Sequence, residues 1–155
     1  MRITIIAAAN KLPGWLETAS RFYMQRFKYP FVVNILPVKL KQWSGALSAA
    51  QRMEQQTNAL FACVPKGYSV VLLDSTGEQL SSPDLAERYN GFLASGANVA
   101  ILIGGPDGFP RKCLTQANQV WALSRLTLPH ALAQLVLLEQ TYRAMTMLQG
   151  HPYHK

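Results

Sequence analysis

Residues 101–109 read ILIGGPDGF, an apolar run that passes directly into a glycine-rich turn. A short apolar run that ends at glycines is typical of a buried strand followed by a tight loop. In an open parallel sheet, ligands bind beyond the carboxyl ends of the strands. The stretch therefore favours an α/β fold and marks the loop after residue 103 as a candidate binding site.

The rest of the chain alternates apolar runs with helical periodicity. Short, partly β-branched runs predict strands at 2–8, 31–38, 68–74, 98–103 and 120–124. Helices are expected at 14–27, from Ser44 to about Cys63, from Ser82 to Gly96, briefly after Pro110, and from about His130 to Gln149. This alternation predicts one α/β domain over residues 1–155, with a largely parallel sheet covered by helices on both faces.

The last predicted helix, at about 130–149, is apolar around most of its circumference. Such a helix must be buried on several sides. It is either buried within one subunit, or part of its surface faces a second subunit. We favour the second explanation, which predicts a dimer.

The chain has 155 residues, of which 49% are hydrophobic, enough for one domain with a sizeable core. We find no signal-peptide pattern and no apolar run long enough to cross a membrane, so a cytoplasmic protein without a membrane partner is expected. Cys63 and Cys113 are predicted to be buried free thiols, which fits a reducing compartment.

The net charge of +7 is unevenly distributed. Residues 1–66 contain nine lysines and arginines against two glutamates, whereas residues 67–155 contain six charges of each sign. A concentrated basic face indicates a polyanionic partner such as nucleic acid. A generally basic protein without such a partner would have the same composition, so charge alone leaves both explanations open.

The glycine loop does not match the familiar phosphate-binding motifs. A dinucleotide fingerprint that ends at Gly108 would need glycine where Ile103 stands, and a triphosphate loop would need lysine after its last glycine. Gly104 and Gly105 do allow a flat ligand to approach the backbone closely. Taken alone, the loop is more often a plain turn than a binding site.

Two further strand ends are expected beside this loop, at Leu73 and at residues 123–129. The second contains the apolar segment LTLP (126–129). Its backbone groups are suited to read the edge of an adenine while Leu126 and Leu128 cover the face of the ring. Together the three strand ends favour a binding site over a plain turn.

The remaining polar motifs have simpler explanations. His151 and His154 have the spacing of a metal-binding pair, but no third ligand stands nearby, so no metal site is expected. His130 is interpreted as a capping or hydrogen-bonded residue at a helix start. Glu139 and Arg143 are spaced as an i,i+4 ion pair.

Four segments, IGGPDG (103–108), LTLPH (126–130), EQTYRA (139–144) and HPYH (151–154), carry a family resemblance. Over its whole length the chain resembles the bacterial large-subunit ribosomal RNA pseudouridine N3-methyltransferases of the SPOUT superfamily. The resemblance implies a SPOUT-type α/β knot, with a trefoil knot on its C-terminal side, although true knots are rare. It also implies a homodimer that methylates 23S ribosomal RNA in the assembled ribosome, with S-adenosylmethionine as the donor.

The resemblance assigns roles to individual residues as well. The donor would lie between three loops, and no metal is needed because its sulfonium is already activated. The tail of one subunit would reach the cofactor of the other, with His154 as the base and Tyr153 as an orienting or stacking group. The implied cofactor-binding residues are Leu73, Gly104, Gly105, Leu123, Ser124, Arg125, Leu126, Thr127, Leu128 and Pro129.

The chain departs from the family pattern in two places. Lys155 ends the tail where arginine is frequent, and the loop at 39–44 is shorter and less basic than usual. A second hypothesis is a non-catalytic RNA- or ribosome-binding protein that has retained the knot. The intact GGPDG and LTLP segments favour an enzyme, since a pure binder has no need of a cofactor pocket.

Overall fold

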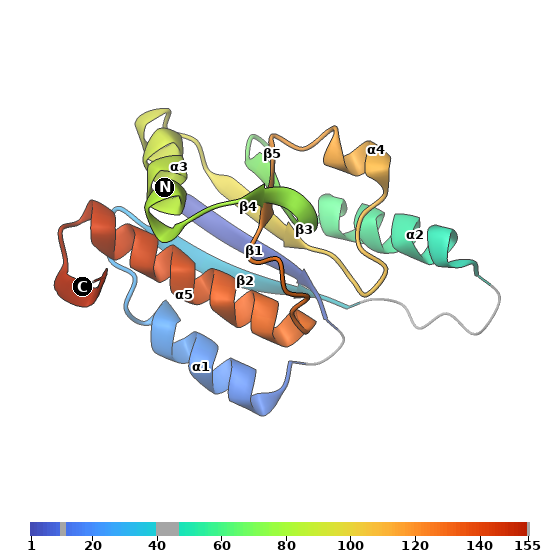
Figure 1. The fold of residues 1–155 in the computed structure, drawn as a ribbon, viewed down its shortest axis with the longest axis horizontal. Coiled ribbons are helices and arrows are strands. Elements are labelled where there is room, and N and C mark those ends of the chain that lie inside the picture. The colour runs from blue at the N-terminus through green and yellow to red at the C-terminus, as the bar shows by residue number, and fades with distance from the viewer. Residues whose placement is uncertain (10–11, 40–46, 155) are drawn as a thin grey trace.

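A computed structural model describes residues 1–9, 12–39 and 47–154 (Figure 1). Strands and helices alternate along the described chain, which confirms the predicted α/β class. The elements are β1 (Arg2–Ala8), α1 (Gly14–Met24), β2 (Val32–Val38), α2 (Ala49–Ala62), β3 (Ser69–Gln79), α3 (Ser82–Ala94), β4 (Val99–Ile103), α4 (Arg111–Leu114), β5 (Gln119–Ala122), α5 (His130–Leu148) and the 3₁₀ segment η1 (Pro152–His154).

The five strands form one sheet in the order β2-β1-β4-β3-β5, and every pairing is parallel. All positions of β4 are buried, as expected for a parallel strand covered on both faces. Leu73 of β3 is level with Ile103 of β4 and with Trp121 of β5. The irregular segment of β3 after Leu73 and the loops after β4 and β5 therefore start side by side at one edge of the sheet.

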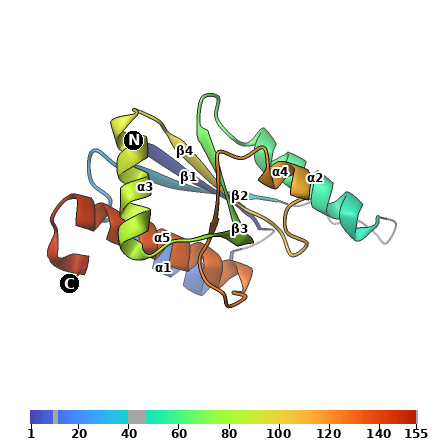
Figure 2. The ribbon, with the colours of Figure 1, turned by 45° about the horizontal axis from the view of Figure 1, so that its top comes forward.

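Helices cover both faces of the sheet, as predicted (Figure 2). Successive residues of a strand point to opposite faces, so Ile5 and Ile6, both fully buried, belong to two separate cores. The first core contains side chains of α3 and α5, with partly buried residues of α1 packed against it. The second contains side chains of α2 and α4.

Two helix starts are set by capping boxes. The Ser48 hydroxyl accepts a hydrogen bond from the Gln51 N–H at 3.2 Å, and the Gln51 side chain accepts one from the Ser48 N–H at 2.9 Å. The cap predicted at Ser44 lies outside the described residues. α3 is capped by Ser81, one residue before the predicted Ser82, because Ser81 forms the same reciprocal pair with the third helical residue.

Other boundaries differ from the predicted ones by a few residues. α1 ends at Met24 rather than at 27, and β5 spans Gln119–Ala122 rather than 120–124. β3 runs on to Gln79, five residues beyond its predicted end at 74. This extension follows an irregularity in its pairing with β5, which bears directly on the site described below.

Burial within one subunit accounts for most of the apolar surface of α5. Leu137, Leu138 and Met145 are buried, and among its described large hydrophobic side chains only Leu132 is exposed, at 41%. Trp15 and Phe22 on the neighbouring α1 are about half exposed. In this region of the chain the exposed large apolar side chains therefore lie on α1 and the first turn of α5. The dimer stays a prediction.

Candidate functional site

The three loops at the carboxyl edge of the sheet enclose a cavity of about 370 Å³. This volume lies within the range of small-molecule and cofactor sites. The cavity is lined by Leu73, Asp74, Ser75, Ile103, Gly104, Gly105, Pro106, Gly108, Phe109, Leu123, Ser124, Leu126, Thr127, Leu128, His130 and Ala133.

Eight of the ten residues predicted to bind the cofactor line this cavity. Arg125 is not among the lining residues, and neither is Pro129, which is the N-cap of α5. Sequence reasoning gave His130 only a helix-start role. The other lining residues that were not predicted to bind the cofactor are Asp74, Ser75, Ile103, Pro106, Gly108, Phe109 and Ala133. The signal for His130 was its place directly after the LTLP segment, where the chain turns back towards the glycine loop.

The GGPDG segment forms a tight turn. The Gly108 N–H donates to the Gly105 carbonyl at 3.0 Å, and Gly108 has a φ of +75°. Since Asp107 does not have a positive φ, the turn is not of type II; proline at its second position and glycine at its fourth are typical of type I. A Cβ at Gly104 would lie 3.1 Å from the Phe109 ring, so the close packing of this ring in the cavity wall requires glycine at residue 104.

Asp107 is not among the residues that line the cavity. Its carboxylate is 3.5 Å from Nε of Arg52 on α2, in a partly exposed ion pair. A pair of this kind contributes little to stability, about 0–1 kcal/mol. It ties the tip of the glycine turn to the neighbouring helix.

The loop after β5 is shaped by its own serine. The Ser124 hydroxyl accepts a hydrogen bond from the Leu126 N–H at 2.9 Å, which is a serine turn. Leu126 is 75% exposed although it is a large apolar residue. A ligand in the cavity would give this side chain an apolar surface to cover, as the adenine hypothesis requires.

His130 closes the cavity on the side of α5. Its Nε2 is buried and has no partner among the described residues. Burial lowers the pKa of the imidazole, and a backbone hydrogen bond at Gly104 offsets part of that effect. The ring is therefore neutral at pH 7, with a polar atom that lacks a partner in the protein.

The C-terminal tail packs back onto α5 of its own chain. The Tyr153 hydroxyl donates to Oε1 of Glu139 at 3.2 Å, and the same oxygen accepts from Nη2 of Arg143 at 2.9 Å. The Tyr153 ring also lies edge-on against Tyr142, with 4.8 Å between centroids. The predicted Glu139–Arg143 ion pair is thus present and also anchors the tail.

Burial raises the pKa of the Tyr153 phenol, with further contributions from Tyr23 and the Glu139 carboxylate. Tyr153 is therefore protonated near neutral pH and acts as a donor in this arrangement. His154 lies in η1, and Lys155 is outside the described residues. Among the described residues, no three His, Cys, Asp or Glu side chains gather as metal ligands would.

The model of a family described as predicted SPOUT methyltransferases matches residues 1–154. The chain is a SPOUT methyltransferase. Membership implies the trefoil knot predicted from the sequence. Among the described helices of this SPOUT methyltransferase, none is long and apolar enough to cross a membrane.

Curated relatives match this SPOUT methyltransferase along their whole length. Proteins named ribosomal RNA large subunit methyltransferase H from Hahella chejuensis and Coxiella burnetii are 37% and 34% identical to it. Each alignment covers 100% of this chain and at least 99% of the relative. A putative methylase family protein of known structure from Neisseria gonorrhoeae aligns with 90% of this chain and 81% of its own, with a TM-score of 0.49 and 13% identity.

The residues of the cavity fit the methyl donor that such an enzyme requires. The walls are mainly apolar, Gly104 and Gly108 keep one side free of side chains, and the Nε2 of His130 offers an unpaired polar atom. One charged side chain, Asp74, lies at the irregularity within β3. These are the features of a site for a partly apolar, partly charged nucleoside.

Proposed function

We propose that this SPOUT methyltransferase transfers a methyl group from S-adenosylmethionine to N3 of a pseudouridine in 23S ribosomal RNA, within the assembled ribosome. The observation that carries the proposal is that the bulge in β3 and the ends of β4 and β5 share one cavity, lined by eight of the ten residues that the family resemblance implied. The full-length relatives named ribosomal RNA large subunit methyltransferases support the substrate class.

Within the cavity, the protein binds and orients the donor. The backbone of residues 123–129 is suited to the adenine edge, and Leu126 and Leu128 to its face. When bound, S-adenosylmethionine supplies a methyl group on a positively charged sulfur. The remaining task of the protein is to hold the target nitrogen in line with that methyl and to accept its proton.

We infer that the side chains that hold the target nitrogen and accept its proton come from a second subunit. The cavity lies at the N-terminal end of α5, and η1 follows its C-terminal end (Figure 1). The tail turns back along α5, where the Tyr153 hydroxyl is held at Glu139, nine residues from His130, which at about 1.5 Å per residue is about 14 Å along the helix axis. In this position the tail does not line the cavity of its own chain. We therefore assign His154, as base, and Tyr153, as orienting group, to the cavity of the other subunit in a homodimer.

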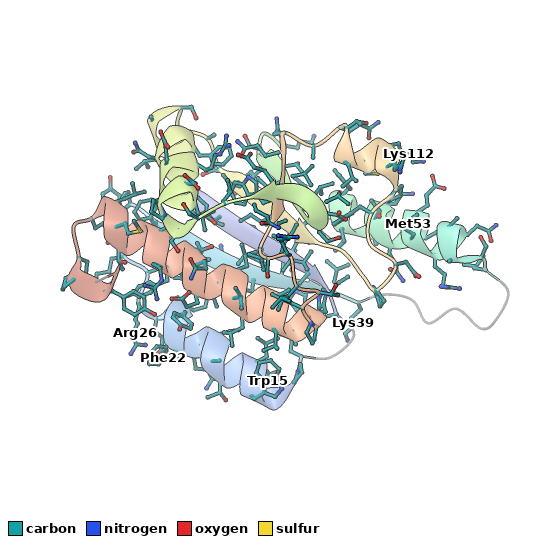
Figure 3. The ribbon with its side chains drawn as sticks, in the orientation of Figure 1. Trp15, Phe22, Arg26, Lys39, Met53 and Lys112 are labelled. Atoms are coloured by element: carbon teal, nitrogen blue, oxygen red, sulfur yellow. The ribbon has the colours of Figure 1, made fainter. Side chains whose placement is uncertain are left out.

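The exposed surface supports this arrangement. Trp15 and Phe22 lie on α1, which packs beside α5 (Figure 3). Exposed aromatic side chains at this density mark contact surfaces. The excess of basic residues in the first half of the chain fits contact with ribosomal phosphates. Because ribosomes are the proposed substrate, the proposal also includes a cytoplasmic location.

The experiment that tests the activity is methyl incorporation into ribosomes from a strain that lacks this gene, followed by mapping of the modified nucleotide. The proposal expects methylation of one pseudouridine in the large subunit. Incorporation at a ribose or at a guanine would contradict the target while leaving the methyltransferase class intact.

A calorimetric titration with S-adenosylmethionine separates the enzyme from a non-catalytic ribosome-binding protein. The enzyme binds the donor, whereas absence of binding would favour the binder. Deletion of residues 151–155 is expected to abolish methylation and to leave donor binding unchanged, since the residues that line the cavity all lie between 73 and 133. Normal turnover by this truncated protein would exclude a role for the tail.

A further inference from the structure

β3 is interrupted where it meets the cavity. Leu73 and Glu78 both pair with Trp121 of β5, so residues 74–77 are looped out between them. Bulges of this kind bend a strand and redirect side chains, and they are frequent beside active sites. The bulge here directs Asp74 and Ser75 to the cavity instead of to the helices that cover the sheet.

The bulge fixes one oxygen of Asp74 and leaves the other without a partner. Oδ1 accepts hydrogen bonds from the Thr76 N–H at 2.9 Å and from the Thr76 hydroxyl at 2.7 Å. Oδ2 lies 3.8 Å from where a Cβ of Gly108 would stand, so it lies against the glycine turn, and both residues line the cavity. Within the described chain, no hydrogen bond or ion pair reaches Oδ2.

No counter-ion balances this carboxylate among the residues that line the cavity. The lining contains one acidic side chain, Asp74, and no lysine or arginine. His130 is the other titratable group of the lining, and its ring is neutral at pH 7. A lone carboxylate in a concave, largely apolar wall attracts a positively charged ligand group more strongly than it would in open water.

We propose that Asp74 is a specificity-determining residue whose carboxylate contacts the positively charged methionine half of S-adenosylmethionine. The inference rests on the proposed function, which supplies the ligand. Three ligands differ in this half. S-adenosylmethionine carries a sulfonium, an ammonium and a carboxylate, S-adenosylhomocysteine carries the ammonium and the carboxylate, and 5′-methylthioadenosine carries none of the three.

The test is Asp74→Asn, titrated calorimetrically with each of the three ligands. Asparagine retains an oxygen that accepts both bonds from Thr76, so the bulge is preserved and only the charge is lost. S-adenosylmethionine is expected to bind about tenfold more weakly, the usual effect of losing one charge-assisted contact. The affinity for 5′-methylthioadenosine is expected to stay within about twofold of the wild-type value, because this ligand has no positively charged group that contacts Asp74.

Glu78→Gln is the matched control. It removes the same charge from the other end of the same bulge, where the carboxylate pairs with Arg88 at 2.7 Å outside the cavity. All three affinities should stay unchanged. A measurement on the wild-type protein does not depend on how the variant folds: the preference for S-adenosylmethionine over 5′-methylthioadenosine should fall as salt is raised.

The pattern of losses decides the outcome. If the variant loses more affinity for S-adenosylmethionine than for S-adenosylhomocysteine, Asp74 contacts the sulfonium. If it loses equal affinity for both and binds 5′-methylthioadenosine unchanged, Asp74 contacts the ammonium. Equal losses for all three ligands, or no loss for any, would overturn the proposal. A wild-type protein that binds none of them would instead contradict the proposed function.

Discussion

At the scale of single residues, Gly77 is the position with the least room. A Cβ there would lie 2.6 Å from the carbonyl carbon of Trp121 and 2.8 Å from the Trp121 nitrogen. These are backbone atoms of β5, which cannot move aside as a flexible side chain would. The bulge that presents Asp74 to the cavity therefore depends on the absence of a side chain at residue 77.

Gly77→Ala is expected to destabilise the protein by about 1–3 kcal/mol, as overpacking of a rigid site does. Donor affinity should fall as well, because the bulge forms part of the cavity wall. Gly91→Ala is the control: it lies in α3 with nothing within 4 Å of its Cβ position, and should stabilise by about 0.5–1 kcal/mol. Urea unfolding measures the stability of both variants. Equal changes in their free energies of unfolding would refute the steric argument.

His130 gives a second prediction at this scale, in the dependence of stability on pH. Burial lowers the pKa of its ring below the value of about 6.5 in the unfolded chain. Its contribution is therefore complete above about pH 6.5, and it is lost as the pH falls and the unfolded state takes up the proton. His130→Gln should reduce the loss of stability between about pH 7 and pH 5. Urea unfolding at both pH values measures this, and an unchanged slope would contradict it.

At the scale of elements, α5 contributes to the cavity and also holds the C-terminal tail. Its first turn bears His130 and Ala133 at the cavity, and Glu139, two turns further on, holds the tail. The Glu139 carboxylate accepts hydrogen bonds from Arg143 and Tyr153 together, and Arg143 also lies over the Tyr153 ring, 5.2 Å from its centroid. The helix thus fixes the tail without contact with the donor.

Glu139→Ala is expected to loosen the tail and lower kcat on the order of 10–100-fold, since catalysis is sensitive to small displacements of a reacting group. Donor affinity should stay unchanged because the cavity is remote from Glu139. Hydrogen exchange of residues 151–154, methylation kinetics and calorimetry measure the three effects. Glu87→Ala, which removes an exposed carboxylate of α3, is the control. An equal loss of activity in this variant would contradict a specific role of Glu139 in positioning the tail.

What the sequence could predict at this scale follows from how local each feature is. Apolar runs indicated the strands, and parallel pairing brings their ends together, so the loops at Leu73, Gly104 and 123–129 could be identified in advance. The bulge could not, because the apolar run of β3 stops at Leu73 while its pairing resumes at Glu78. The contact between Tyr153 and Glu139 depends on a chain reversal at the end of α5, which no local pattern indicates.

At the scale of the whole molecule, the proposed function places the cavity of one subunit beside the tail of another. In the chain itself, the cavity lies at the first turn of α5, the tail is held at Glu139 further along the helix, and packing against α1 and α3 holds the helix in place. In a two-fold symmetric dimer the same interface is used twice, so each tail can complete the site of the other subunit. Two different defects in one protein should then complement each other.

The prediction is restored activity on mixing two inactive variants. One lacks residues 151–155, and the other carries Gly104→Val, which crowds Phe109 in the cavity wall. After subunit exchange, half of the dimers hold one subunit of each kind and therefore one complete site, so about a quarter of wild-type activity should return. Methylation assays of the variants before and after mixing measure it. Activity that stays at the level of the separate variants, although exchange is demonstrated, would mean that tail and cavity act within the same subunit.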